Sequence, residues 1–496
     1  MKRVSNLLIV LLVFLVFSCS SSKSENDTDI LPDSDTDDTE TIADDDTYEE
    51  DSDFIDDSDE TPVLDDDDPE DTSYCDEEDE EESNDEDTIS SYTRCYDEIP
   101  DEPYEGFFAD PDLGYWVKRS LGYDENYELT EEDLKKVTRV SVYSQDIRGI
   151  EKLINLESVK ISGSNVYDYT PLSKLEKLKE MKIDGNNIDC LDESFALLTN
   201  LETLEIRESK LKDVSPVEQL INLTSLDLNK NQIEFLPKNI GNLQKLKELG
   251  FSYNKMKDIK SLHSLTNLEV LFFTNNQVEN ICPIKNMTKL VKINFSSNNV
   301  TDISLIKNFS ELEILGADKN KIEKLPDFQR LRKLRYIYLD FNNISNLPNL
   351  KGLDSLTELW LGYNKLNNED FFKLDELTTV EFLEIAFNNI TKVPVLKNMK
   401  SLYELLLTGN NINDLTGFAD NESFPALKRL DVGSNKIENV EAFRDRKGLT
   451  SLWVDKNCIK DFSPLEELKE HGTHVGGMNE QLESCENTTT IFKDGE

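Results

Sequence analysis

The sequence predicts an α/β solenoid, a stack of similar coils that share one curved parallel sheet. A pattern of apolar residues with one Asn recurs about every 22 residues over most of the chain. Between the copies, prolines are followed by apolar residues at intervals of three. A single copy is too short to bury its own apolar face, so the coils must stack on one another to form a continuous core.

The acidic composition narrows the choice of partners. The chain has 496 residues, with 53 Lys and Arg against 102 Asp and Glu, and its formal net charge is -49. Nucleic acids and anionic membrane surfaces attract clustered basic residues, which a net acidic chain does not supply. We therefore expect no nucleic-acid partner and no electrostatic binding to a membrane.

Residues 1–18 have the organisation of a secretory signal peptide. Lys2 and Arg3 precede an apolar run over 7–17 that is too short to span a membrane. The run ends in the letters VFSC, which resemble a bacterial lipobox, and this resemblance implies cleavage before Cys19 and acylation of that residue. Ser20 after the cysteine is similar to outer-membrane lipoproteins, so we expect a lipid-anchored, surface-exposed protein of the cell envelope. The alternative is a plain secretory signal with an incidental cysteine.

Residues 19–104, which include the lipidated cysteine, are expected to form a disordered acidic tether. The segment has long Asp and Glu runs, few large apolar residues and only Lys23 and Arg94 as basic residues. It cannot bury enough apolar surface to offset the entropy of ordering. Runs such as Asp33 to Asp38 could instead bind calcium, but they lack the ligand spacing and the turning glycine of an EF-hand loop. Weak counterion binding is the simpler interpretation.

Residues 105–136 are predicted to form a helical cap on the first coil. Asp110 before Pro111 is a helix start, and Thr130 with Asp133 spells a capping box. Apolar residues of the first helix share one face: Leu113, Trp116, Val117 and Leu121.

Residues 137–470 carry the repeats. The pattern Leu-x-x-Leu-x-Leu-x-x-Asn-x-Ile, or a close variant, starts at Leu156, Leu178, Leu201, Leu223, Leu246, Leu268, Leu290, Leu312, Leu334, Leu356, Val380, Leu402, Leu427 and Leu449. A weaker copy starts at Val137. Residues one, four and six of each copy should point inward from a short strand, so these copies predict about fifteen strands.

The Asn at the ninth position of a copy can bond the backbone of neighbouring coils through its amide. We therefore predict a buried ladder formed by Asn186, Asn231, Asn254, Asn276, Asn298, Asn320, Asn342, Asn364, Asn388, Asn410, Asn435 and Asn457. Ser164 and Ser209 take this position in two copies, where the ladder should be weaker.

The repeats resemble the leucine-rich repeat family, and the cap and return segments are similar to those of bacterial internalins. Return segments such as 171–178 begin with a proline and have apolar residues three apart, which suits a convex side rich in 3₁₀ helix. The resemblance implies a horseshoe with a parallel sheet on its concave side. It does not imply host-cell invasion, since the predicted attachment at Cys19 differs from that of internalins.

The concave face should present residues three, five, seven and eight of each copy. In early copies these positions are mainly charged or polar, as in Lys160, Lys182, Asp184, Glu205, Arg207 and Asp227. Later they become aromatic, giving a predicted ligand-binding stripe of Tyr253, Phe272, Tyr336, Tyr338, Phe341, Trp360, Tyr363, Phe382, Phe387 and Trp453. Exposed aromatic residues are typical of binding hot spots. Packing alone can account for aromatics at position eight, so position five, with Tyr338 and Trp360, decides for binding.

Six cysteines remain beyond the lipidated one, in a protein whose export permits disulfides. Cys75 could pair with Cys95, and Cys458 with Cys485 in the C-terminal cap and tail of residues 471–496, although sequence does not fix the connectivity. The two other cysteines, Cys190 and Cys282, are interpreted as buried thiols.

No motif indicates catalysis or a cofactor, and no metal site is expected because His471 and His474 lack a third ligand. We therefore predict a non-catalytic surface protein that recognises a protein ligand on its concave face, with adhesion or recognition as its role. Two alternatives stay open. The aromatics could stack on a polysaccharide, or the chain could be a structural envelope protein with an endogenous partner.

Overall fold

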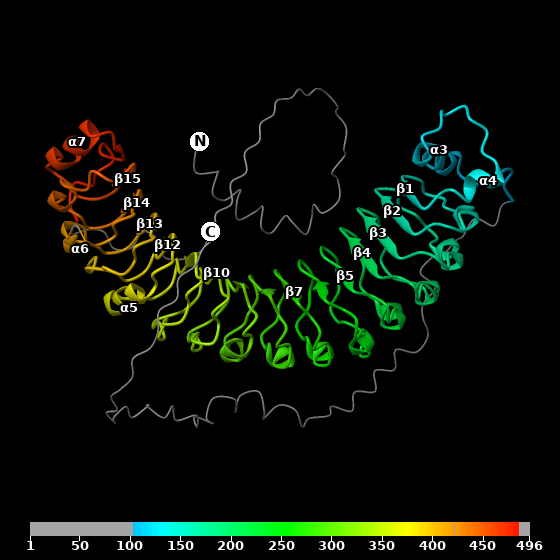
Figure 1. Cartoon of the computed structure of the whole chain (residues 1–496), viewed down its shortest axis with the longest axis horizontal. Helices are drawn as coiled ribbons and strands as arrows, with labels where there is room; N and C mark the ends of the chain where they lie inside the picture. The colour runs from blue at the N-terminus through cyan, green and yellow to red at the C-terminus, as the bar shows by residue number, and fades with distance from the viewer. Residues whose placement is uncertain (1–102, 421, 486–496) are drawn as a thin grey trace, which may run out of the picture. The chain divides into compact units, whose positions relative to one another are not determined.

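A computed structural model describes residues 103–420 and 422–485, which form a curved solenoid (Figure 1). The predicted signal peptide, Cys19, the acidic tether and the Cys75 and Cys95 pair lie outside the described residues. Within the described residues, no helix is long and apolar enough to cross a membrane.

One sheet of 16 parallel strands lines the concave side, and each strand pairs with the next in sequence (Figure 1). The strands are β1 (Arg139–Val142), β2 (Ser158–Ser162), β3 (Glu180–Asp184), β4 (Thr203–Arg207), β5 (Ser225–Asp227), β6 (Glu248–Gly250), β7 (Val270–Phe272), β8 (Lys292–Asn294), β9 (Ile314–Gly316), β10 (Tyr336–Tyr338), β11 (Glu358–Trp360), β12 (Phe382–Glu384), β13 (Glu404–Leu406), β14 (Arg429–Asp431), β15 (Ser451–Trp453) and β16 (His474–Gly476). The predicted concave parallel sheet is therefore confirmed, with one more strand than the repeats indicated.

The convex side carries short 3₁₀ segments, as predicted, and some α-helix. The 3₁₀ segments are Ile150–Lys152, Thr170–Lys174, Glu193–Leu197, Ser215–Gln219, Ile240–Asn242, Lys260–Leu262, Cys282–Ile284, Ser304–Asn308, Leu374–Glu376 and Glu441–Phe443. The helices in and after the repeats are α5 (Asn368–Lys373), α6 (Thr416–Ala419) and α7 (Ser463–Glu470). The copies that contain α5 and α6 are two and three residues longer than 22, and these extra residues provide room for a helical turn.

The core runs continuously through the stack because the inward positions of every coil are apolar. In one coil, Leu334, Ile337 and Leu339 are fully or almost fully buried. Neighbouring coils bury Phe251, Phe273 and Phe295 in one column, with ring centroids 5.5 and 5.7 Å apart. Each coil therefore buries its apolar face mainly against its two neighbours.

The predicted asparagine ladder is present. Asn342 is buried, and its Nδ2 donates to the carbonyls of Ala317 and Leu339 at 3.0 Å each. Its Oδ1 accepts the backbone N–H of Ile322 in the preceding coil at 3.0 Å. The hydroxyl of Ser209 instead donates only to Arg207 in its own coil, so the ladder is weaker there, as predicted.

Two helices cover the N-terminal edge of the sheet. α3 (Pro111–Ser120) begins where Asp110 accepts the backbone N–H of Asp112, and it buries Leu113 and Val117. α4 (Glu131–Leu134) begins with the predicted capping box of Thr130 and Asp133. These residues shield the open side of β1 from water, which an end coil requires.

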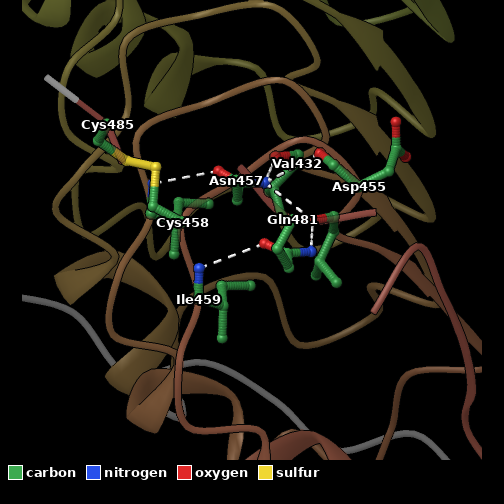
Figure 2. Close-up of a disulfide and its surroundings, with 9 residues drawn as sticks. Val432, Asp455, Asn457, Cys458, Ile459, Gln481 and Cys485 are labelled. Atoms are coloured by element: carbon green, nitrogen blue, oxygen red, sulfur yellow. Dashed lines mark hydrogen bonds between the residues drawn. A yellow bond between two sulfur atoms is a disulfide. The ribbon is translucent and has the colours of Figure 1, made fainter. Parts of the chain in front are cut away.

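The C-terminal edge is closed by β16, which extends the sheet beyond residue 470, and by a disulfide between Cys458 and Cys485 (Figure 2). Gln481 takes the place of the ladder asparagine beyond Asn457. Its Oε1 accepts the Ile459 backbone N–H at 3.2 Å (Figure 2), and its Nε2 donates to the Val454 carbonyl at 2.9 Å. This disulfide is one of the two cysteine pairs that the sequence analysis considered.

The interpretation of Cys190 and Cys282 as buried thiols is wrong. Both residues are only half-buried, and both are disulfide-bonded. Their positions in return segments place them near the surface of the solenoid, where the inward-facing pattern of the repeat does not apply.

Candidate ligand-binding face

The eighth residue of nearly every coil has a left-handed backbone conformation. Phe341, Tyr363 and Phe387 have φ of 55°, 54° and 52°, whereas Gly185 and Gly409 meet the same requirement in other coils. A side chain in this region costs about 1–2 kcal/mol relative to right-handed backbone, and glycine avoids that cost. Bulky aromatic residues at three successive coils are therefore unfavourable for the backbone and must be offset by other interactions.

These three rings form a stacked column beside the ends of β10, β11 and β12, which we call the outer column. Phe341 and Tyr363 have centroids 4.0 Å apart and an interplanar angle of 10°. Tyr363 and Phe387 follow at 4.2 Å and 14°. A Cβ at Gly409 would lie 2.4 Å from the Phe387 ring, so glycine allows that ring to lie over the next coil. Stacking of this kind contributes about 0.5–1.5 kcal/mol per pair, which offsets part of the backbone cost.

A second group of rings, which we call the inner column, lies on the strands themselves and contains Tyr338, Trp360 and Phe382. Trp360 stacks on Phe382 at 4.5 Å, and its centroid lies 6.0 Å from that of Tyr338. Tyr338 is only 4% exposed, whereas Trp360 and Phe382 are half-buried. The accessible part of this column is therefore Trp360 and Phe382.

Not all of the predicted stripe belongs to these columns. Tyr336 lies on the same strand as Tyr338, with the Arg335 guanidinium 5.3 Å from its ring centroid. Tyr253 and Phe272 belong to the coils of β6 and β7, and the coils of β8 and β9 separate them from the columns. Trp453 on β15 is separated by β13 and β14. The structure thus concentrates the predicted aromatics on β10–β12 and leaves three of them apart.

The charged early coils neutralise themselves. Lys182 Nζ lies 3.0 Å from Glu180 and 3.1 Å from Glu205. Arg207 pairs with Asp227 at 2.5 Å and with Glu205 at 3.5 Å. These ion pairs neutralise one another's charges, so this part of the face does not need a charged partner.

Carboxylates of the middle coils lie between the two columns, at positions five and seven. Glu384 is the register partner of Trp360. A Cβ at Gly362 would lie 2.7 Å from Glu384 Oε1 and 3.3 Å from Asp340 Oδ1, so the two carboxylates occupy the volume above this glycine. Asp340 Oδ1 also accepts the Gly362 backbone N–H at 2.7 Å. Sequence reasoning missed this pair because the two residues are 44 positions apart in a generally acidic chain.

The carboxyl pKa values reflect this crowding. Burial raises the pKa of Glu384 to about 7, with a further contribution from Asp318. Burial also raises the pKa of Asp318 to about 6, and it raises that of Asp340 well above its usual range, with Glu384 adding to the effect. Removing carboxylates from water and placing them near one another disfavours their charged form.

Other hollows of the described chain are less specific. A shallow cavity of about 500 Å³ lies at the starts of the early strands. Lysines, glutamates and asparagines line it, so its lining carries charges of both signs. Among the described residues, no group of three or more His, Cys, Asp or Glu is arranged to hold a metal ion.

Comparison with known proteins agrees with this geometry. Family models described as "Leucine Rich repeats (2 copies)" and "Leucine Rich Repeat" match residues 244–286 and 222–243. The fold is a leucine-rich repeat solenoid. No curated protein sequence matches the chain.

Solved structures of this leucine-rich repeat fold include bacterial proteins and a plant receptor. The chain is 26% identical to the internalin InlF of Listeria monocytogenes, over 74% of this chain and 95% of that one, with a TM-score of 0.55. A leucine-rich repeat protein of Leptospira interrogans is 23% identical over 71% and 95%, with a TM-score of 0.61. The plant peptide hormone receptor RGFR1, in complex with RGF2, is 20% identical over 68% and 64%, with a TM-score of 0.51.

Proposed function

We propose that this protein is a non-catalytic recognition or adhesion protein that binds a protein ligand on the concave face of β10–β12. We further propose that lipid on Cys19 holds it at the bacterial outer membrane, where the acidic segment displays the repeats at the surface. The observation that carries the binding proposal is the pair of aromatic columns on an exposed sheet face. Aromatic residues are enriched in binding hot spots.

The arrangement of the rings supports this proposal. Position eight is left-handed in nearly every described coil, but among these coils only those of β10–β12 carry three stacked aromatic residues there in succession. The fold is also suited to the role, since the plant receptor of the same architecture is in complex with a peptide ligand. A curved face of parallel strands presents side chains from several coils to one partner.

The glycan alternative has weaker support. Sugars stack on exposed ring faces, but both faces of Tyr363 are occupied by Phe341 and Phe387. Trp360 likewise places one face against Phe382. The columns therefore offer mainly ring edges, which suit an apolar protein surface better than a pyranose.

The test is a capture experiment with the full chain from host extracts, envelope extracts and glycan libraries. The variant combines Trp360→Ala, Phe382→Ala and Tyr363→Ala, which removes accessible rings and spares the buried Tyr338. A matched control removes exposed aromatics away from the columns through Phe235→Ala, Tyr253→Ala and Tyr403→Ala, at residues 69%, 55% and 49% exposed.

We expect a protein that the wild type and the control capture and the column variant loses, while all three have the same circular dichroism. Equal capture by the column variant would place the site elsewhere. Loss of a glycan instead of a protein would favour the polysaccharide alternative, and a single endogenous envelope protein recovered by crosslinking in cells would favour the structural one.

A further inference from the structure

The carboxylates between the columns differ from the charges of the early coils because none of them forms an ion pair among the described residues. Within residues 103–420 and 422–485, no Lys or Arg forms an ion pair with Asp318, Asp340 or Glu384, whereas Lys182 and Arg207 each bridge two acids in the early coils. The nearby Lys319 points instead at the Phe341 ring, with its Nζ 5.6 Å from the centroid. The middle of the face thus carries carboxyl groups that have no Lys or Arg ion-pair partner among the described residues.

One of these carboxylates is incompletely satisfied. Asp318 Oδ2 accepts the Ser296 hydroxyl at 3.0 Å, but its buried Oδ1 has no hydrogen-bond partner. Buried polar atoms in folded proteins almost always have a partner, so this oxygen keeps an unused acceptor position. The negative charge of Asp318 also disfavours ionisation of Glu384 and Asp340.

At Gly362, two other carboxylates of this face lie close to the backbone. A Cβ at this residue would lie 3.3 Å from Asp340 Oδ1 of the preceding coil and 2.7 Å from Glu384 Oε1 of the following coil, so the two carboxylates themselves occupy the volume above the glycine. Trp360 leans toward Phe382 on one side of these carboxylates, and Tyr363 of the outer column stands on the other. The carboxylates thus form an acidic strip between the two aromatic columns, which we call the acidic channel.

We propose that this channel receives an Arg or Lys side chain of an extended segment of the protein ligand, with apolar residues of that segment resting on the aromatic columns. The proposal rests on the proposed function and names the chemistry of its partner. A guanidinium or ammonium donates charge-assisted hydrogen bonds to the carboxylates, and its stem and planar group pack on aromatic rings. Charge complementarity of this kind also fixes the register of the bound segment.

The probe is a phage-displayed library of random dodecapeptides, selected on the immobilised full chain in physiological salt. Retained peptides are then synthesised twice, once as selected and once with each Arg replaced by citrulline or each Lys by norleucine. Their affinities are measured for the wild type, for the variant Asp340→Asn with Glu384→Gln, and for the column variant described above.

A charge-matched control is required because the acidic segment before residue 105 also attracts basic peptides. The control variant combines Glu279→Gln and Glu323→Gln, both of which are exposed residues outside the channel. It retains the acidic segment and loses the same number of charges. Melting temperatures check that the channel variant is folded.

We expect the selected peptides to be rich in Arg or Lys and to lose affinity by about tenfold or more for the channel variant, and on citrulline or norleucine replacement. The control variant should bind them like the wild type. Peptides without basic residues, equal binding to the channel variant, or displacement from the wild type by millimolar calcium would each overturn the proposal.

Failure of the channel is distinguishable from failure of the proposed function. If peptides bind the channel variant but not the column variant, the aromatic binding site stands and the channel proposal is wrong. Peptides held by both variants would remove the site on β10–β12 as well. If the selection yields no peptide while the capture experiment still yields a protein that needs the columns, only the channel proposal is wrong.

Discussion

At the scale of single residues, the left-handed eighth position makes a direct prediction about stability. Ser434 has φ of 52° and is half-buried, so Ser434→Gly should relieve the backbone and stabilise the protein by about 0.5–1 kcal/mol. Tyr363 has almost the same φ, but Tyr363→Gly removes two stacking contacts and should destabilise by about 1–2 kcal/mol. Urea denaturation of both variants checks this. Stabilisation by both changes would mean that stacking does not offset the backbone cost, and destabilisation by both would mean that the left-handed position carries no such cost.

The carboxylates of the channel predict how stability depends on pH. In the folded chain the pKa of Glu384 is raised to about 7, so the folded state keeps a proton that the unfolded chain releases near its ordinary value. Stability contributed by this proton is present at low pH and is lost as pH rises through about 7. Glu384→Gln should therefore raise the free energy of unfolding more at pH 8 than at pH 5. We expect this difference to exceed that of the exposed control Glu279→Gln by about 1–2 kcal/mol. Parallel pH profiles for the two variants, from thermal melts, would contradict it.

At the scale of the elements, the asparagine ladder should contribute strongly to the coupling of neighbouring coils. Asn342→Ala leaves two carbonyls and one backbone N–H without their buried partner, so we expect a loss of about 2–4 kcal/mol. The neighbouring residue Asn343 is the matched control, because its side chain lies outside the ladder. Hydrogen exchange should accelerate around β9, β10 and β11 in the first variant only. Uniform acceleration along the sheet would show that coupling is global rather than between neighbours.

The elements also differ in how well the sequence predicts them. Strands, ladder and caps were predictable because each follows from a local pattern repeated in register, as with Thr130 and Asp133 in the capping box. Strand β16 was not, since residues 474–476 lack the full repeat pattern and Gln481 replaces the ladder asparagine. The acidic channel also escaped prediction. Its residues come from different coils, and the glycine between them allows their carboxylates to lie close to the backbone.

At the scale of the whole molecule, charge is arranged unevenly along the concave face. The early coils carry both signs and pair them, as in Arg207 with Asp227, while the coils of β9–β12 carry acids and stacked rings. Strong negative charge over the rest of the chain repels acidic partners and speeds the approach of basic ones in a salt-dependent way. The aromatic columns would then hold a ligand that the overall field has attracted, so affinity and association rate depend on different residues.

The proposed attachment also belongs to the whole molecule and has its own test. Two or three acyl chains hold a protein stably on a bilayer, because each buried CH₂ contributes about 0.8 kcal/mol. Cys19→Ala removes the proposed acylation site, so we expect loss of labelling by an alkyne fatty acid and loss of the protein from the membrane fraction. The column variant, which retains Cys19, should remain in that fraction and serves as the control. Persistent labelling of the Cys19→Ala chain would mean that lipid is attached elsewhere. Membrane retention without any labelling would mean that a partner, rather than lipid, holds the chain at the envelope.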